Sequence, residues 1–197
     1  MNYERQLIEL IKRNNGLVFS SQVDEAGIPR IYLSQMVHKG MLYKFSRGAY
    51  LTSDAADDEM VRLQARYPKG VFSHGTALYL HGLQDRAPLY YTMTFPDKYH
   101  CISLEDGYIS AFYVNKQNFE LGMTNQPSMA GRLVRTYNRE RTICDIVRNR
   151  NKTDNIVLYD ALKRYVGSKS KDIQLLMEYA KSLRVEKKMR EYIEGLL

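Results

Sequence analysis

The chain has 197 residues, a formal net charge of +7 and a pI of about 9.3, which leaves room for one large domain or two small ones and favours a polyanionic partner. Its two cysteines, Cys101 and Cys144, lie far apart without companion ligands, so neither a disulfide framework nor a cysteine zinc site is expected. The charged N-terminus and the lack of an apolar run of about 20 residues argue against a signal peptide and a membrane helix, and a soluble cytoplasmic protein is expected.

The first fifty residues predict three short helices followed by a hairpin. Apolar residues recur with helical spacing over residues 3–11. Serine, proline and glycine signals then favour a second helix at 20–26 and a third at 29–39. Two apolar runs, 41–45 and 49–51, are separated by a turn that contains a glycine, and they predict two short strands.

The third helix has two contrasting faces. Leu33, Met36 and Val37 fall on one side, which is expected to face the core, and short polar residues with one glutamine fall on the other. Such side chains suit contacts with base edges, and the basic hairpin that follows would place cations on phosphates, as in a winged helix-turn-helix. Domains with these elements also bind proteins or only form a core. The expected DNA-binding residues are Ser20, Ser21, Gln22, Arg30, Ile31, Tyr32, Ser34, Gln35, His38, Lys39, Lys44 and Arg47.

The middle of the chain begins with an acidic stretch at residues 52–59. We interpret its carboxylates as a hinge and as the first turn of a helix, where the helix dipole favours negative charge. Ser73 is expected to cap a helix that Gly82 ends. His74 and His81 are expected to cap or pack, because two histidines without a third ligand make a poor metal site.

Four later segments are rich in aromatic and β-branched residues and predict strands. They are 89–96, 108–114, 119–123 and 132–137, and their spacing favours a small, mainly antiparallel sheet. Two or three helices are expected to complete the chain.

The expected fold class is therefore α+β, in two domains. Residues 1–53 would form a winged helix-turn-helix DNA-binding domain. Residues 54–197 would form a mixed α/β C-terminal domain that combines the small sheet with C-terminal helices.

The most distinctive segment is the arginine-rich stretch YNRERTICDIVRNRNKTDN at residues 137–155. Arginine at this density suits recognition of phosphate or carboxylate groups. The alternative is a solvated helix in which Glu140 and Asp145 pair with neighbouring arginines. The expected second phosphate-contact or antitoxin surface consists of Arg135, Arg139, Arg141, Arg148, Arg150 and Lys152.

Two motifs, S-H-x-T-A-L-x-L-H-G-L at residues 73–83 and E-R-T-I-C-D at 140–145, make the chain resemble the AbiEi antitoxins of bacterial abortive-infection systems. The resemblance implies a type IV antitoxin encoded beside a nucleotidyltransferase-like toxin, in a pair that limits phage spread. It also implies that the N-terminal domain binds inverted repeats in promoter DNA and so represses its own operon. Two copies on one repeat are a further hypothesis. The C-terminal domain would counter the toxin without a stable complex.

Two other classes of function remain open. One is a plain winged-helix regulator whose C-terminal domain senses a ligand or forms a dimer. The other is an enzyme that uses a winged helix for targeting, but the chain has no glycine-rich phosphate loop, H-E-x-x-H motif or nucleophile elbow. We therefore expect a binding protein with no catalytic residues, metal or cofactor.

Overall fold

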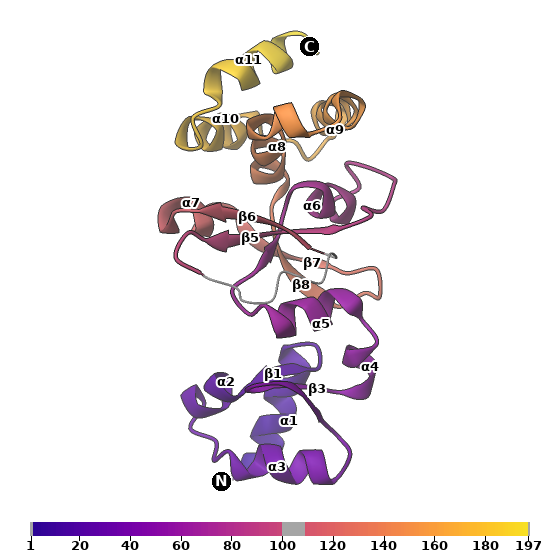
Figure 1. Cartoon of the computed structure of the whole chain (residues 1–197), viewed down its shortest axis with the longest axis vertical. Helices are drawn as coiled ribbons and strands as arrows, with labels where there is room; N and C mark the ends of the chain where they lie inside the picture. The colour runs from indigo at the N-terminus through magenta and orange to yellow at the C-terminus, as the bar shows by residue number, and fades with distance from the viewer. Residues whose placement is uncertain (1, 100–108, 197) are drawn as a thin grey trace. The chain divides into compact units, whose positions relative to one another are not determined.

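The computed structural model describes residues 2–99 and 109–196, and the chain divides into two compact units (Figure 1). Unit 1 is Met1–Pro68 with Pro127–Val134, and unit 2 is Lys69–Gln126 with Arg135–Leu197. Unit 1 therefore extends past residue 53, where the sequence placed the end of the N-terminal domain. Cys101 lies outside the described residues.

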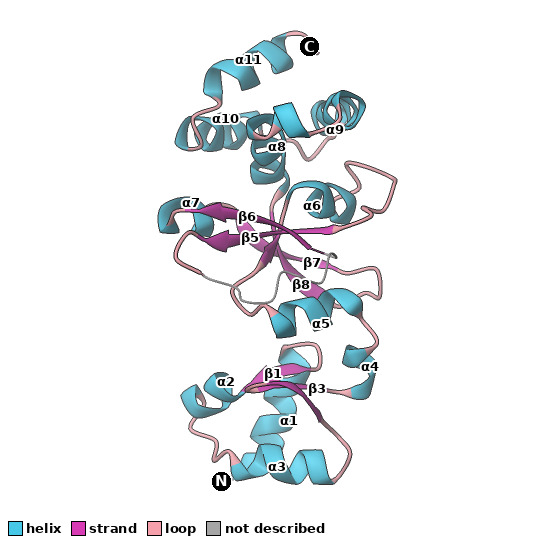
Figure 2. Ribbon diagram, viewed as in Figure 1, coloured by secondary structure: helices cyan, strands magenta, loops and turns pink. Residues whose placement is uncertain are grey.

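Unit 1 begins with the elements that the sequence predicts. Its three strands form an antiparallel sheet in the order β1-β3-β2. Figure 2 labels the neighbouring strands β1 and β3 of this sheet. The three helices and the hairpin are confirmed, and β1 is an addition. The elements are α1 (Tyr3–Arg13), β1 (Leu17–Phe19), α2 (Ser20–Glu25), α3 (Ile31–His38), β2 (Tyr43–Ser46), β3 (Ala49–Leu51), α4 (Ser53–Ala56) and α5 (Glu59–Arg66).

The core of unit 1 follows from helical spacing. Leu7 on α1 packs with Leu33 and Met36 on α3, and each of the three side chains is at most 1% exposed. Val37, expected on the same side of α3, is only partly buried against this cluster. The apolar stripe of α3 is therefore narrower than predicted, which leaves more of the helix facing outward.

The segment Pro127–Val134 is bound to unit 1 by polar contacts. The Ser128 hydroxyl donates to the Asp58 carboxylate, whose other oxygen accepts from the backbone N–H of Met60 at 2.9 Å and so caps α5. The Arg132 guanidinium donates to the Asn15 carbonyl at 2.6 Å and also to Asp54. Two carboxylates of the acidic stretch therefore have structural roles: Asp58 caps α5, and both Asp58 and Asp54 hold Pro127–Val134 in unit 1.

Unit 2 is built on a five-stranded sheet in the order β6-β5-β4-β8-β7. The helices α6, α8, α9, α10 and α11 contribute side chains to one hydrophobic cluster. Its elements are β4 (Val71–Phe72), α6 (His74–Leu80), β5 (Tyr91–Pro96), β6 (Ile109–Val114), α7 (Lys116–Glu120), β7 (Met123–Pro127), β8 (Leu133–Tyr137), α8 (Arg139–Arg148), the 3₁₀ turn η2 (Arg150–Lys152), α9 (Asn155–Gly167), α10 (Ile173–Ser182) and α11 (Glu186–Glu194).

Two expectations about this sheet are wrong. The sheet is mixed and not mainly antiparallel, because β5 pairs in parallel with β6 and β4 pairs in parallel with β8, while β4 and β5 are antiparallel. The expected strand at 119–123 instead contains the last two residues of α7, a turn at 121–122 and only the first residue of β7. The first turn of α7 is capped by the Asn115 side chain. Residue composition indicates a strand but not its direction, which the connections determine.

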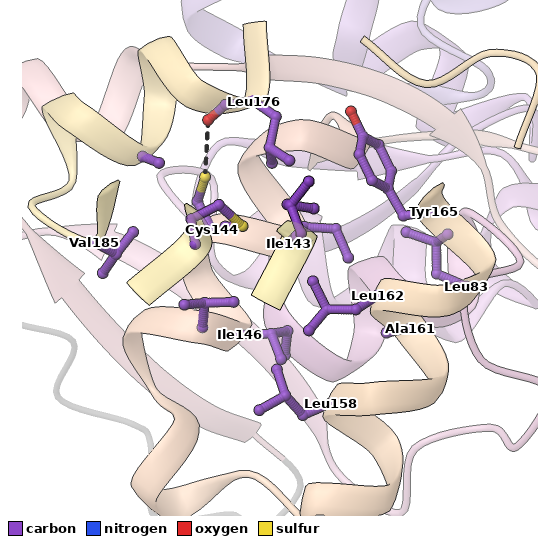
Figure 3. Close-up of a cluster of buried hydrophobic side chains, with 14 of the residues drawn as sticks. Leu83, Ile143, Cys144, Ile146, Leu158, Ala161, Leu162, Tyr165, Leu176 and Val185 are labelled. Atoms are coloured by element: carbon purple, nitrogen blue, oxygen red, sulfur yellow. Dashed lines mark hydrogen bonds between the residues drawn. The ribbon is translucent and has the colours of Figure 1, made fainter. Parts of the chain in front are cut away.

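The hydrophobic cluster of unit 2 lies between α8 and the helices that follow it (Figure 3). Ile143, Leu162 and Leu176 are each at most 1% exposed. The Cys144 thiol donates to the Leu176 carbonyl at 3.6 Å, and burial raises the pKa of this thiol well above its usual range. Within the described residues, no helix is long and apolar enough to cross a bilayer.

Truncation of a core side chain on α9 should destabilise the protein far more than truncation of a surface one. Leu162→Ala removes a side chain with no exposed surface and is expected to lower the free energy of unfolding by about 2–5 kcal/mol. Ile156→Ala, on the same helix but 78% exposed, should change it by less than about 0.5 kcal/mol. Urea denaturation of both variants measures the difference, and equal losses would contradict the packing described.

Candidate nucleic-acid interface

The outward face of α3 carries polar side chains that the fold does not use. Ser34, Gln35 and His38 are exposed, and within the described residues their side chains make no hydrogen bond or ion pair. Ile31, at the start of the same helix, is 58% exposed. Tyr32 is half-buried against the ring of Tyr3, with 5.6 Å between the ring centroids. The predicted exposed face therefore exists, and it combines hydrogen-bonding groups with one aliphatic side chain.

Two of the expected DNA-binding cations lie beside α3 in exposed ion pairs. The Arg30 guanidinium donates to both Asp24 carboxylate oxygens, at 2.8 and 2.5 Å, and these hydrogen bonds lower the pKa of Asp24. The Lys39 ammonium lies 2.5 Å from Glu4. Water screens ion pairs at such exposed positions, so neither pair holds its cation strongly.

The hairpin of β2 and β3 presents two further cations. Lys44 on β2 and Arg47 in the turn are exposed, and within residues 2–99 and 109–196 neither side chain has a partner. The Ser20 backbone N–H donates to the Gly48 carbonyl at 2.8 Å and thereby attaches the turn to the start of α2. The position of the hairpin relative to the helices is therefore fixed by the backbone.

The start of α2 is less available for contact with DNA than the sequence predicts. Ser21 is exposed, but Gln22 is half-buried. The Gln22 side-chain oxygen accepts from the backbone N–H of Phe19 at 3.0 Å and from the Asn14 amide at 3.2 Å. Gln22 therefore holds the entry to α2 in place, a role that spacing alone could not separate from a DNA contact.

The expected second cationic surface contains one residue that cannot reach a phosphate. Arg141 is fully buried, and its guanidinium donates from Nε to Asp145 Oδ1 at 3.0 Å and from Nη1 to the Leu121 carbonyl at 3.0 Å. It also lies over the ring of Tyr137, 4.2 Å from the ring centroid. The expectation for Arg141 is wrong because α8 turns this position into unit 2, where Asp145 one helical turn later pairs with it.

Two more of these arginines are largely occupied within the fold. Arg139 is half-buried and donates to the Ser168 hydroxyl at 3.2 Å and to the His81 carbonyl at 3.2 Å. Arg135 is also half-buried, and burial lowers its pKa. Arg148, at the end of α8, and Lys152, in η2, are exposed. Arg150 is half-buried, and its guanidinium donates to the Val147 carbonyl at 3.3 Å.

The two histidines of α6 pack, as expected. His74 adopts a left-handed backbone with φ of 46°, approaches the Ser73 hydroxyl at 3.0 Å and stacks on Phe112 with ring centroids 3.5 Å apart. His81 donates from Nε2 to the Tyr137 carbonyl at 2.6 Å. Burial lowers the pKa of both imidazoles, that of His74 from 6.5 to about 4. No group of three or more His, Cys, Asp or Glu side chains within the described residues has a metal-binding arrangement.

Residues 5–52, which run from α1 to the end of the hairpin, match the sequence profile of a family of transcriptional regulators. That family is described as "Transcriptional regulator, AbiEi antitoxin", so the resemblance to AbiEi antitoxins is confirmed for this segment. No curated protein matches the chain.

One similar solved structure is "Crystal structure of RV2827C protein from Mycobacterium tuberculosis". It has a TM-score of 0.51 and 14% sequence identity, over 92% of this chain and 72% of that chain. At this identity the likeness is one of fold alone.

The buried imidazole of His74 should make stability depend on pH. The unfolded chain binds a proton there near pH 6.5, and the folded chain only near pH 4. The free energy of unfolding is therefore expected to fall, by on the order of 3 kcal/mol, as the pH is lowered between these values. Urea denaturation over this range measures the loss.

The control is His74→Asn, because asparagine tolerates the left-handed backbone but does not titrate. Its stability should depend less on pH than that of the wild type, although His81 retains a smaller contribution of the same sign. Identical pH profiles for the two proteins would show that His74 is not held neutral by the fold.

Proposed function

We propose that this protein is an AbiEi-type antitoxin that represses its own operon and counters a nucleotidyltransferase-like toxin in the cytoplasm. In this proposal unit 1 is a winged helix-turn-helix, with α2 and α3 as the helix pair and the β2–β3 hairpin as the wing. The observation that carries it is the unbonded polar face of α3 beside two free cations, in a segment that matches a regulator family.

The recognition helix of the proposed domain is α3. A helix lies in a DNA major groove of about 12 Å width, and residues on its exposed face then contact base edges. Gln35 can pair with an adenine through two hydrogen bonds, and Ile31 can contact a thymine methyl group. Arg30 and Lys39 would exchange their weak ion pairs for phosphates, with release of counterions.

The wing fixes the register of this helix on DNA. Lys44 and Arg47 would contact phosphates, and the hydrogen bond from Ser20 to Gly48 keeps them in place relative to α2. Two copies on an inverted repeat would each place one α3 in a major groove. The exposed Arg148 and Lys152 of unit 2, with the half-buried Arg150, supply a second set of cations for phosphates or for the antitoxin activity.

A second candidate function is a regulator whose unit 2 binds a small ligand. A cavity of about 240 Å³ lies in unit 2 between His74, Asp145 and Arg148, and this observation favours it. The two functions are compatible, because ligand binding in unit 2 and DNA binding by unit 1 involve different residues.

Binding to the DNA upstream of the protein's own gene should be tight, specific and sensitive to salt. Gln35→Ala removes a base contact and is expected to cost about 1–3 kcal/mol on the operator and little on random DNA. Arg47→Ala removes a phosphate contact and should weaken binding to both, with a salt slope smaller by about 1. Fluorescence anisotropy over a salt series measures both effects.

Arg13→Ala is the matched control. Arg13 is an exposed cation at the end of α1, whereas α1 contacts α3 through Tyr3 at its start. It should bind like the wild type. Equal affinity of the wild type for operator and random DNA would overturn the repressor proposal and return α3 to a protein-binding or packing role.

Neutralisation of the toxin should survive loss of DNA binding. We expect Gln35→Ala combined with Arg47→Ala, expressed from an unrelated promoter, to rescue the growth of cells that express the adjacent toxin gene as well as the wild type does. The same variant should fail to repress a reporter that carries the native promoter. Loss of rescue at normal protein levels would show that the antitoxin activity depends on unit 1.

A further inference from the structure

A cavity of about 240 Å³ opens in unit 2 and is distinct from the proposed DNA-binding face. It lies between the start of α6, the end of β6 and the last turn of α8. The side chains that give it chemical character are those of His74, Phe112, Asp145, Arg148 and Asn149. Two of these, His74 and Asp145, belong to the motifs that the DNA-binding role does not use.

Asp145, which lines the cavity, has a buried carboxylate oxygen without a partner within the described residues. Asp145 is 3% exposed, and its Oδ1 accepts from Arg141 Nε at 3.0 Å. Within residues 2–99 and 109–196, Asp145 Oδ2 has no hydrogen-bond partner. A buried carboxylate oxygen left in this state is costly, and a ligand N–H donor that enters the cavity would satisfy it.

The charges around the cavity leave a positive excess. Arg141 neutralises Asp145, and burial lowers the pKa of His74 to about 4, so its imidazole is neutral at pH 7. Arg148 is exposed, and its side chain has no partner within the described part of the chain. A complementary ligand is therefore an anion that also carries an N–H donor.

Two aromatic residues, His74 and Phe112, form part of the cavity wall and can stack with a planar ligand group. The rings of His74 and Phe112 stack on each other, with 3.5 Å between their centroids and an interplanar angle of 15°, so a planar ligand group can stack only on an outer face of this pair. A volume of about 240 Å³ is below the usual range of about 300–1,000 Å³ for drug-sized ligands, so it accommodates one ring system while the rest of a ligand remains outside.

We propose that this cavity binds a nucleoside monophosphate, with a base N–H donated to Asp145 Oδ2 and the phosphate held by Arg148 at the mouth. The base provides the donor and the planar ring, and the phosphate provides the anion. This inference does not depend on DNA binding by unit 1, because it concerns residues of unit 2 only. It assigns Arg148 to the ligand, which leaves Arg150 and Lys152 as the second set of cations.

Isothermal titration calorimetry with the full chain tests the proposal. The probes are the four common nucleoside 5′-monophosphates, the nucleoside of the tightest binder, and inorganic phosphate. We expect at least one monophosphate to bind, and both its nucleoside and inorganic phosphate to bind at least about tenfold more weakly. Binding by none of the four, or equally tight binding of inorganic phosphate, would overturn the proposal.

Two variants locate the site. Arg148→Ala changes an exposed side chain. It should weaken binding of the monophosphate at least about tenfold and leave binding of the nucleoside unchanged. Asp145→Asn replaces the acceptor and should weaken both. Lys163→Ala, which removes an exposed cation outside the cavity, is the control and should bind like the wild type. If Arg148→Ala binds as tightly as Lys163→Ala, the cavity is not the site, whatever the stability of Asp145→Asn.

Discussion

The buried guanidinium of Arg141 is the constraint around which unit 2 is arranged. It pairs with Asp145 on its own helix, donates to the Leu121 carbonyl after α7, and lies over the Tyr137 ring at the end of β8. A buried charge is costly unless it is partnered, so these three segments meet at one point, and within the described residues only Nη2 of this guanidinium is left without a hydrogen-bond partner. The chain bends tightly there at Gly122, where φ is +74° and an added Cβ would lie 2.7 Å from that of Arg141.

The E-R-T-I-C-D motif at residues 140–145 therefore has a structural role in addition to any functional one. Glu140 accepts from the Tyr165 hydroxyl at 3.0 Å, and Cys144 bonds to the backbone of α10, so the motif connects α8 to the helices that follow. The proposed ligand cavity uses the one carboxylate oxygen of Asp145 that this network leaves free. The same short segment thus supports the helical core and shapes the cavity.

Local periodicity predicted the helices and the hairpin of residues 3–51 well, but it placed neither the segment up to Pro68 nor Pro127–Val134 in unit 1, and it predicted unit 2 only in part. The apolar stripe of α3 and the glycine turn of the hairpin are local signals. The stripe correctly predicted that Ser34 and Gln35 are exposed. Strand direction depends on long connections, so the parallel pairing of β5 with β6 was missed. The density of arginines also led to a wrong prediction that Arg141 contacts phosphates. The sequence alone does not distinguish a solvated arginine from one that is buried with a partner. The unpartnered Asp145 oxygen had no signal in the sequence.

The return of residues Pro127–Val134 to unit 1 limits how this protein can be divided in evolution. Arg132 donates to the Asn15 carbonyl at 2.6 Å, so a late segment of the chain completes the early one. Recombination at a single point, whether after residue 53 or after Pro68, would separate Arg132 from Asn15. The segment proposed to bind DNA can therefore be exchanged between related proteins only if residues 127–134 change together with it.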